Sequence, residues 1–218
     1  ETLGIGPDQL RFLGASEGTI YRNLVQVALK PKTRHDVIQY FKHLSTQVTA
    51  EVLSFRPDVV FTHAWQGGNP EHDLTHVMAR IALEQLPGTA LFEWPNYELA
   101  DTVFLRFPPW HKDPVHSIRL TPTELAAKQR MKRCYPTQDW IIDKLETAMV
   151  VLGTLGRVVG RGFDADSFSS VEYFGTVPRD RDYMESPHRF DALDYIGDDC
   201  DGEGMSYIRM VVPVIQAL

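Results

Sequence analysis

Apolar residues recur at three- and four-residue intervals between positions 36 and 55, the spacing that places side chains on one face of a helix. The residues that mark this face are Val37, Phe41, Leu44, Val48 and Val52. Proline disfavours helical geometry in the residue before it, so Pro57 sets the end of the helix at Arg56. The pattern therefore predicts an amphipathic helix that ends just before a short apolar run.

That run covers residues 59–62 and is apolar and β-branched, which is typical of a strand buried in a parallel sheet. A loop follows over residues 65–70. Val77, Ile81 and Leu83 then place the inward face of a helix over residues 72–86. Strand, loop and helix in this order form the unit of a doubly wound sheet. We therefore expect an α/β fold, a Rossmann-like sandwich with a mostly parallel sheet.

The remaining elements follow from shorter patterns. Gly14 and Gly18 bracket an N-terminal loop, and strands are expected over residues 90–94, 102–107 and 116–120. Thr121 with Glu124 forms a capping box that starts a helix running to about residue 135, and a second helix covers about 138–152. Glycines between 153 and 162 predict a hinge, and residues 198–203 an acidic loop. We expect one domain over 1–218, with 153–218 as its C-terminal part.

Composition excludes several classes of protein. The 218 residues are 43% hydrophobic and 23% charged, as in a globular domain with a core. The net charge of -7 argues against a nucleic-acid partner, because phosphate binding requires positive charge. No apolar run is as long as a membrane span. Two cysteines give no disulfide framework, and we expect a reducing, cytoplasmic location.

Candidate chemistry concentrates in residues 63–76, at the C-terminal end of the first expected strand, where open α/β sheets bind ligands. His72 would lie at the positive end of a helix, where a neutral imidazole is a suitable zinc ligand. A surface loop with two solvated histidines explains the same spacing. His72 and His76 also share one helical face, as in zinc proteases, but Asp73 is one methylene shorter than the glutamate base of those enzymes.

Six segments, in order, resemble the LmbE-like (glycosylphosphatidylinositol de-N-acetylase-type) family. The first three are Phe12-Leu-Gly-Ala-Ser-Glu-Gly-Thr, Arg56-Pro-Asp-Val-Val-Phe-Thr-His and Gly67-Gly-Asn-Pro-Glu-His-Asp-Leu-Thr-His-Val. The others are Phe92-Glu-Trp-Pro-Asn-Tyr, then Leu120-Thr-Pro-Thr-Glu-Leu-Ala-Ala-Lys-Gln-Arg-Met with Cys134-Tyr-Pro-Thr-Gln, and Val171-Glu-Tyr-Phe. The resemblance covers about residues 1 to 190.

The resemblance implies a Rossmann-like enzyme that hydrolyses the acetamide of an N-acetylglucosamine-type substrate with a divalent metal, usually zinc. His72 matches the third metal ligand. The other two ligands and the general base belong to a His-Pro-Asp-Asp-Glu motif that these 218 residues lack. We therefore expect the family's N-terminal strand–helix unit to be missing from this chain. Asn69 stands where the family has the histidine that stabilises the oxyanion, a role its amide could take as a hydrogen-bond donor.

Four more residues are candidates for contact with the substrate: His63, Trp65, Gly68 and, in the part that closes over the site in this family, His188. Each has a structural alternative: His63 can cap a strand end, Trp65 can pack the loop, and His188 can be a surface histidine. A calcium loop beginning at Asp199 is disfavoured, because Met210 stands where the bidentate glutamate belongs.

The sequence thus predicts a zinc-dependent N-deacetylase acting on a small amino-sugar conjugate, with Asn69 catalytic and His72 on the metal. The alternative is a non-catalytic relative that binds a glycoside or a protein and has lost the metal motif. A homo-oligomer is compatible with either.

Overall fold

The computed structural model describes residues 4–96, 100, 105–108, 110–132, 134–136, 143–144, 147, 150–151, 154 and 169–218. The chain divides into two compact units, one of residues 1–12 with 117–172 and the other of residues 13–116 with 173–218. Every residue of the candidate site belongs to the second unit. The expectation of one domain with a closing C-terminal part stays a prediction.

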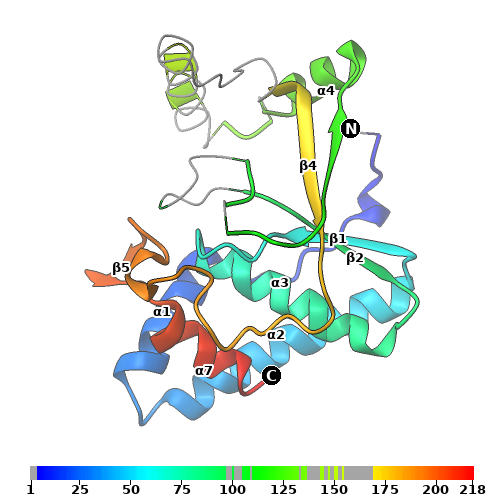
Figure 1. Ribbon diagram of the computed structural model, residues 1–218. Coiled ribbons are helices and arrows are strands. Elements are labelled where there is room, and N and C mark those ends of the chain that lie inside the picture. The colour runs from blue at the N-terminus through cyan, green and yellow to red at the C-terminus, as the bar shows by residue number, and fades with distance from the viewer. Residues whose placement is uncertain are drawn as a thin grey trace. The chain divides into compact units, whose positions relative to one another are not determined.

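The larger unit is built on three helices and a parallel strand pair (Figure 1). The helices are α1 (Glu17–Leu29), α2 (Arg34–Phe55) and α3 (Pro70–Ala82), and the strands are β1 (Val59–His63) and β2 (Ala90–Trp94). The predicted helix over 36–55, the strand over 59–62 and the helix over 72–86 are confirmed, the last ending in a 3-10 turn, η2 (Leu83–Gln85). The unit of strand, loop and helix therefore forms as its local pattern predicts.

The sheet has the strand order β1-β2-β4-β3, with β3 at Val115–Arg119 and β4 at Val171–Thr176. β1 and β2 are parallel, in register from Val59 opposite Ala90 to His63 opposite Trp94. β4 pairs with β2 in the antiparallel direction, with Phe92 opposite Thr176. The α/β class is confirmed, but the mostly parallel sheet is wrong: the described strands form a mixed sheet with one parallel pair. β4 comes from a distant segment of the chain, whose direction no local pattern encodes.

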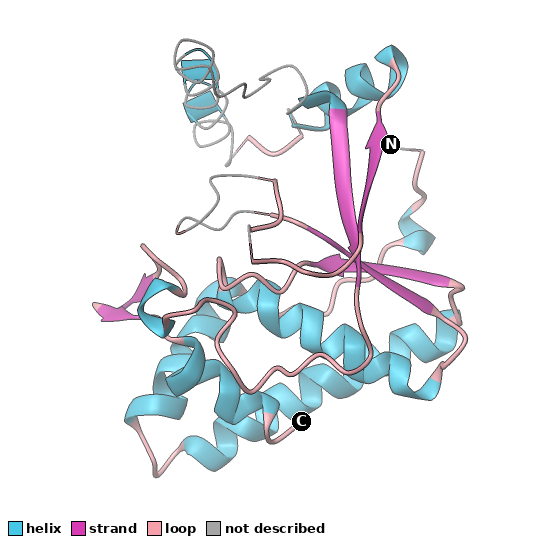
Figure 2. Ribbon diagram, viewed as in Figure 1, coloured by secondary structure: helices cyan, strands magenta, loops and turns pink. Residues whose placement is uncertain are grey.

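One face of the β1–β2 pair is covered by helices of the larger unit (Figure 2). Val60 of β1 packs with Leu83 and Leu91 on the covered face. Val59 and Phe61 point the other way and are each 46% exposed. The strand alternates as the two-residue period requires. His63 continues the row of Val59 and Phe61 into the candidate site.

The main core lies among α1, α2, α3 and the C-terminal helices η4 (Tyr207–Val211) and α7 (Val212–Ile215). Helix α1 was not predicted, and Gly18 lies inside it rather than at the end of a loop. The spacing of its buried residues was the missed signal. Those residues are Ile20, Tyr21, Leu24 and Val27.

Several short elements complete the description: η1 (Pro7–Gln9), α4 (Pro122–Lys132), η3 (Asp191–Leu193), β5 (Asp199–Cys200) and β6 (Glu203–Gly204). The capping box of α4 is confirmed, since Thr121 N–H donates to Glu124 Oε2 at 2.7 Å and Glu124 N–H donates to Thr121 Oγ1 at 3.3 Å. The acidic loop turns the β5–β6 hairpin.

Other expectations are only partly covered. Of the strand expected over 102–107, residues 102–104 lie outside the described residues, and 105–107 are irregular. Residues 143–144, 147 and 150–151 of the second predicted helix are helical, and the rest of it and the hinge glycines lie outside. Among the described residues no helix has the length and apolar character to cross a membrane. Neither cysteine forms a disulfide in this part of the chain.

Candidate functional site

The carboxyl ends of β1 and β2 lie side by side, and residues 64–69 leave this edge to enter α3. Asn69 caps the helix: its Oδ1 accepts from the N–H groups of Glu71, at 2.9 Å, and His72, at 3.2 Å. Its amide donates to the hydroxyl of Tyr21 at 3.0 Å. Asn69 is therefore held as an N-cap, which stabilises the start of the helix. Its catalytic role stays a prediction.

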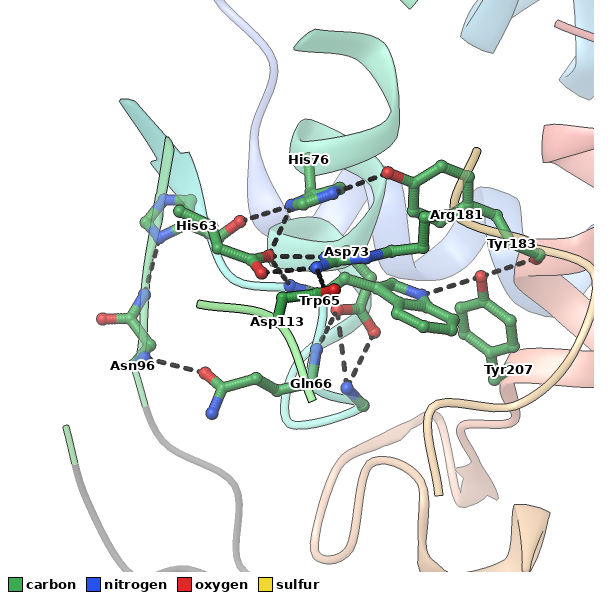
Figure 3. Close-up of polar contacts among 12 residues, drawn as sticks. His63, Trp65, Gln66, Asp73, His76, Asn96, Asp113, Arg181, Tyr183 and Tyr207 are labelled. Atoms are coloured by element: carbon green, nitrogen blue, oxygen red, sulfur yellow. Dashed lines mark hydrogen bonds and ion pairs between the residues drawn. The ribbon is translucent and has the colours of Figure 1, made fainter. Parts of the chain in front are cut away.

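His63 and His72 meet at this edge with their rings stacked, 4.2 Å between centroids and 15° between planes. The amide nitrogen of Asn96 lies 2.6 Å from His63 Nδ1 (Figure 3) and 3.4 Å from His72 Nδ1, so that both rings turn the same nitrogen toward one amide. Burial lowers the pKa of His63, and burial with the neighbouring His63 lowers the pKa of His72 to about 3. Both imidazoles are therefore neutral at physiological pH, the form that binds a metal.

His76 is fully buried one turn further along α3, and both of its ring nitrogens are hydrogen-bonded (Figure 3). Nδ1 donates to the carbonyl of His63 at 2.8 Å, and Nε2 accepts from the hydroxyl of Tyr183 at 2.9 Å. Burial lowers the pKa of His76 to about 4, against the opposing charge of Glu93. With both nitrogens engaged, His76 does not join His72 as a ligand, and the protease interpretation loses its second histidine.

Asp73 holds the backbone of the loop that precedes α3 by hydrogen bonds. Its carboxylate accepts from the backbone N–H groups of Gln66, at 3.0 Å, and Gly67, at 3.2 Å, and from the hydroxyl of Tyr195, at 2.9 Å. Burial raises the pKa of Asp73 to about 8, and these three hydrogen bonds oppose the shift. The backbone of the loop and the hydroxyl of Tyr195 are thus hydrogen-bonded to the same buried carboxyl group.

A second polar cluster lies around Glu93 of β2, which is 1% exposed. Arg181 donates to both of its oxygens, at 2.7 and 2.8 Å, and also to Asp113 at 2.5 Å. Burial opposes ionisation of Glu93, but the hydrogen bonds of Arg181 and the nearby positive charges outweigh it and lower the pKa. Glu93, His111 and Asp113 each bring one ligand atom within 4.8 Å of the others, and the group could hold a metal ion. Arg181 supplies the positive charge there in this structure.

Gly67 and His188 meet in the same region. Gly67 has a φ of +68°, and a Cβ there would stand 2.6 Å from Asp194 Oδ1 and 2.8 Å from His188 Nδ1. His188 Nδ1 lies 2.7 Å from Asp194 Oδ1, and both side chains are buried. The absence of a side chain at Gly67 thus leaves room for the His188–Asp194 pair. Gly68, the second glycine of the loop, stays a prediction as a substrate contact.

Trp65 of the loop has a packing role that the sequence left open. Trp65 donates its indole N–H to the hydroxyl of Tyr207 at 2.9 Å and meets Tyr183 edge to face. The indole therefore packs the loop against the C-terminal segment. The same ring also lines a cavity together with Arg181, so that contact with a ligand remains a prediction.

The histidines give a direct test of this description. In the folded protein the rings of His72 and His76 will stay neutral from pH 8 down to about pH 5, because both pKa values lie below this window. His76 will carry its proton on Nδ1, since that nitrogen donates to the His63 carbonyl. Nitrogen-detected NMR of the imidazoles measures both. The chain unfolded in urea is the control, in which the histidine rings will titrate with a pKa of about 6.5. If the ring of His72 or His76 titrates near that value in the folded protein, the description of the site is wrong.

Of the predicted residues, the structure brings His63 and His72 together, while Trp65 and His188 line two other cavities. Sequence reasoning missed the cluster of Glu93, Asp113 and Arg181 and the bridging amide of Asn96. Glu93 carried a signal, a lone carboxylate in the apolar run of residues 90–94. Arg181 carried none, because it lies 88 positions away along the chain.

Comparisons of the chain with models of known protein families, with characterised proteins and with solved structures find no match.

Proposed function

We propose that this protein is a zinc-dependent N-deacetylase that hydrolyses the acetamide of an N-acetylglucosamine-type substrate. The observation that carries the proposal is the stacked pair of neutral imidazoles, His63 and His72, at the carboxyl edge of a parallel strand pair. This is where open α/β sheets bind ligands. The six ordered segments that resemble the LmbE-like family support the same reaction.

The types of donor present fit zinc, whose usual ligands besides thiolate are imidazole nitrogen and carboxylate oxygen. The edge offers His72 with His63 beside it, and the separate group of Glu93, His111 and Asp113 offers one imidazole and two carboxylates. When bound, zinc would supply an acidified water and a polarised carbonyl. His72 would hold it in the proposal through Nε2, whose electron pair must be free, so Nδ1 would then carry the proton of the ring.

The test is the zinc content of the protein after dialysis against dilute zinc, together with release of acetate from an N-acetylglucosaminide. We expect one zinc per chain, with affinity lowered more than about a hundredfold in His72→Ala, a larger loss than removal of an outer-shell partner. His43→Ala, at an exposed histidine of α2, is the matched control.

Two results would contradict the proposal. If zinc binding survives His72→Ala but is lost in Asp113→Asn, the metal belongs to the Glu93 cluster and the assignment of His72 is wrong. If zinc binds through His72 but no acetate is released, the deacetylase activity is wrong.

The second candidate is a non-catalytic relative that binds a glycoside or a protein. It is favoured by Asn69, whose oxygen caps α3 and whose amide donates to Tyr21. An amide committed in this way must leave Tyr21 before it can stabilise an oxyanion. In a deacetylase, Tyr21→Phe releases the amide and changes the rate of acetate release; in a binding protein the same variant leaves ligand affinity unchanged.

A further inference from the structure

Two cavities adjoin the polar clusters and share part of their walls. The larger has a volume of about 690 Å³ and the smaller about 310 Å³, and Trp110 and Lys112 line both. Both volumes fall in the range of sites for small ligands, roughly 300–1,000 Å³. The smaller cavity is also lined by His111, Asp113 and Arg181 of the second cluster. Trp110 thus lines both the larger and the smaller cavity.

Charge in the larger cavity is balanced. Lys112 and Arg189 contribute two positive charges, and Glu185 and Asp191 contribute two negative ones. An anion or a cation would meet as much repulsion as attraction from these four groups. The same four side chains also supply several N–H donors and several carboxylate acceptors. The wall therefore suits a neutral ligand with many hydroxyl groups.

One side of the larger cavity is formed by the rings of Trp110 and His188. Trp110 meets the ring of His188 edge to face at 5.8 Å between centroids. His188 is held by Asp194 at 2.7 Å, and Ser186 fixes the other oxygen of Asp194 at 2.6 Å. His188 and Asp194 are 3% and 4% exposed, so this pair forms a fixed wall rather than a mobile surface. Indole offers an apolar face against which the C–H face of a sugar ring packs.

We propose that the larger cavity is a binding site for a neutral sugar ring, with Trp110 packing against the ring and the His188–Asp194 pair forming the wall beside it. The proposal rests on the proposed function for one point only, the N-acetylated character of the sugar. It places sugar recognition away from His63 and His72, on Trp110 and the segment that follows β4.

The experiment is calorimetric binding of N,N′-diacetylchitobiose to the whole chain in the presence of EDTA, so that no metal and no turnover contribute. We expect binding, weakened about tenfold in Trp110→Ala, the loss that one aromatic contact explains. Phe55→Ala is the matched control, because Phe55 is an aromatic residue 81% exposed at the end of α2. N-Acetylglucosamine 6-phosphate should bind no more tightly than N-acetylglucosamine.

The outcomes separate this proposal from the enzymatic one. Absence of chitobiose binding, or equal binding by the wild type and Trp110→Ala, overturns the sugar site. Phosphate-dependent tightening of tenfold or more overturns its neutral character. Sugar binding that depends on Trp110, with no acetate release after zinc is restored, supports the site while contradicting the deacetylase. His188→Gln, which keeps a side chain of similar length, should weaken binding without unfolding the chain, as circular dichroism will show.

Discussion

Replacing Arg181 with methionine will lower the free energy of unfolding by about 3–5 kcal/mol, because it leaves a buried carboxylate without its partner. Glu93 is 1% exposed and accepts both of its strongest hydrogen bonds from this guanidinium, whose side chain is 8% exposed. Urea denaturation of the wild type and the variant measures the difference. Arg209→Met, at an exposed arginine, should change stability by less than about 0.5 kcal/mol.

The effect also has a predictable dependence on pH. The pKa of Glu93 is lowered in the fold, so its pairing with Arg181 stabilises the protein above the unfolded pKa of about 4.3 and is lost as the pH falls through the folded value. Arg181→Met removes the hydrogen bonds and the charge of the guanidinium, so that burial, which favours the neutral carboxyl group, raises the pKa of Glu93 in the variant. The difference between wild type and variant should therefore shrink as the pH falls from this raised pKa towards the lowered pKa of Glu93 in the wild type.

A double variant keeps the prediction testable if the single one does not fold. Glu93→Gln with Arg181→Met removes both charges, so it should be more stable than Arg181→Met alone, and the cycle of four proteins gives the coupling energy. A loss below about 1 kcal/mol in Arg181→Met would mean that Glu93 has another partner. In that case added zinc should stabilise the variant, which tests the group of Glu93, His111 and Asp113 as a metal site.

Local periodicity was enough to predict the segment from α2 through β1 to α3. The apolar positions of α2 and α3 and the β-branched run of β1 all act over a few residues, and the structure forms each of these elements. The candidate loop could be placed for the same reason, since it lies between a strand and a helix that the sequence reveals. His72 was correctly placed in the first turn of a helix.

Interactions between distant segments account for the features that the sequence did not reveal. Arg181 reaches Glu93 from 88 positions away, and Tyr195 reaches Asp73 from 122. The antiparallel pairing of β4 with β2 depends on the path of the chain over residues 95–170, which no period of 2 or 3.6 residues encodes. The crowding around Gly67 could not be predicted for the same reason, because the side chains that lie against it come from the C-terminal segment.

Replacing Gly67 with alanine is the second substitution with a large expected effect. Its φ of +68° belongs to the region that costs a residue with a Cβ about 1–3 kcal/mol, and the added carbon would stand 2.6 Å from Asp194 Oδ1. Overpacking adds about 1–3 kcal/mol, so we expect a total loss of about 2–6 kcal/mol in the free energy of unfolding. Gly88→Ala is the control, because nothing lies within 4 Å of a Cβ there.

The two contributions can be separated in a background that removes the nearest oxygen. In Asp194→Ala the alanine at position 67 no longer meets that carboxylate but still meets His188 Nδ1 at 2.8 Å, so Gly67→Ala should cost less than in the wild type. An equal cost in both backgrounds would mean that the carboxylate of Asp194 contributes nothing to the loss. A cost below about 0.5 kcal/mol in the wild type would contradict the close approach of Asp194 and His188 to the loop. It would thereby remove the fixed wall on which the sugar site is built, since that wall depends on the His188–Asp194 pair lying against Gly67.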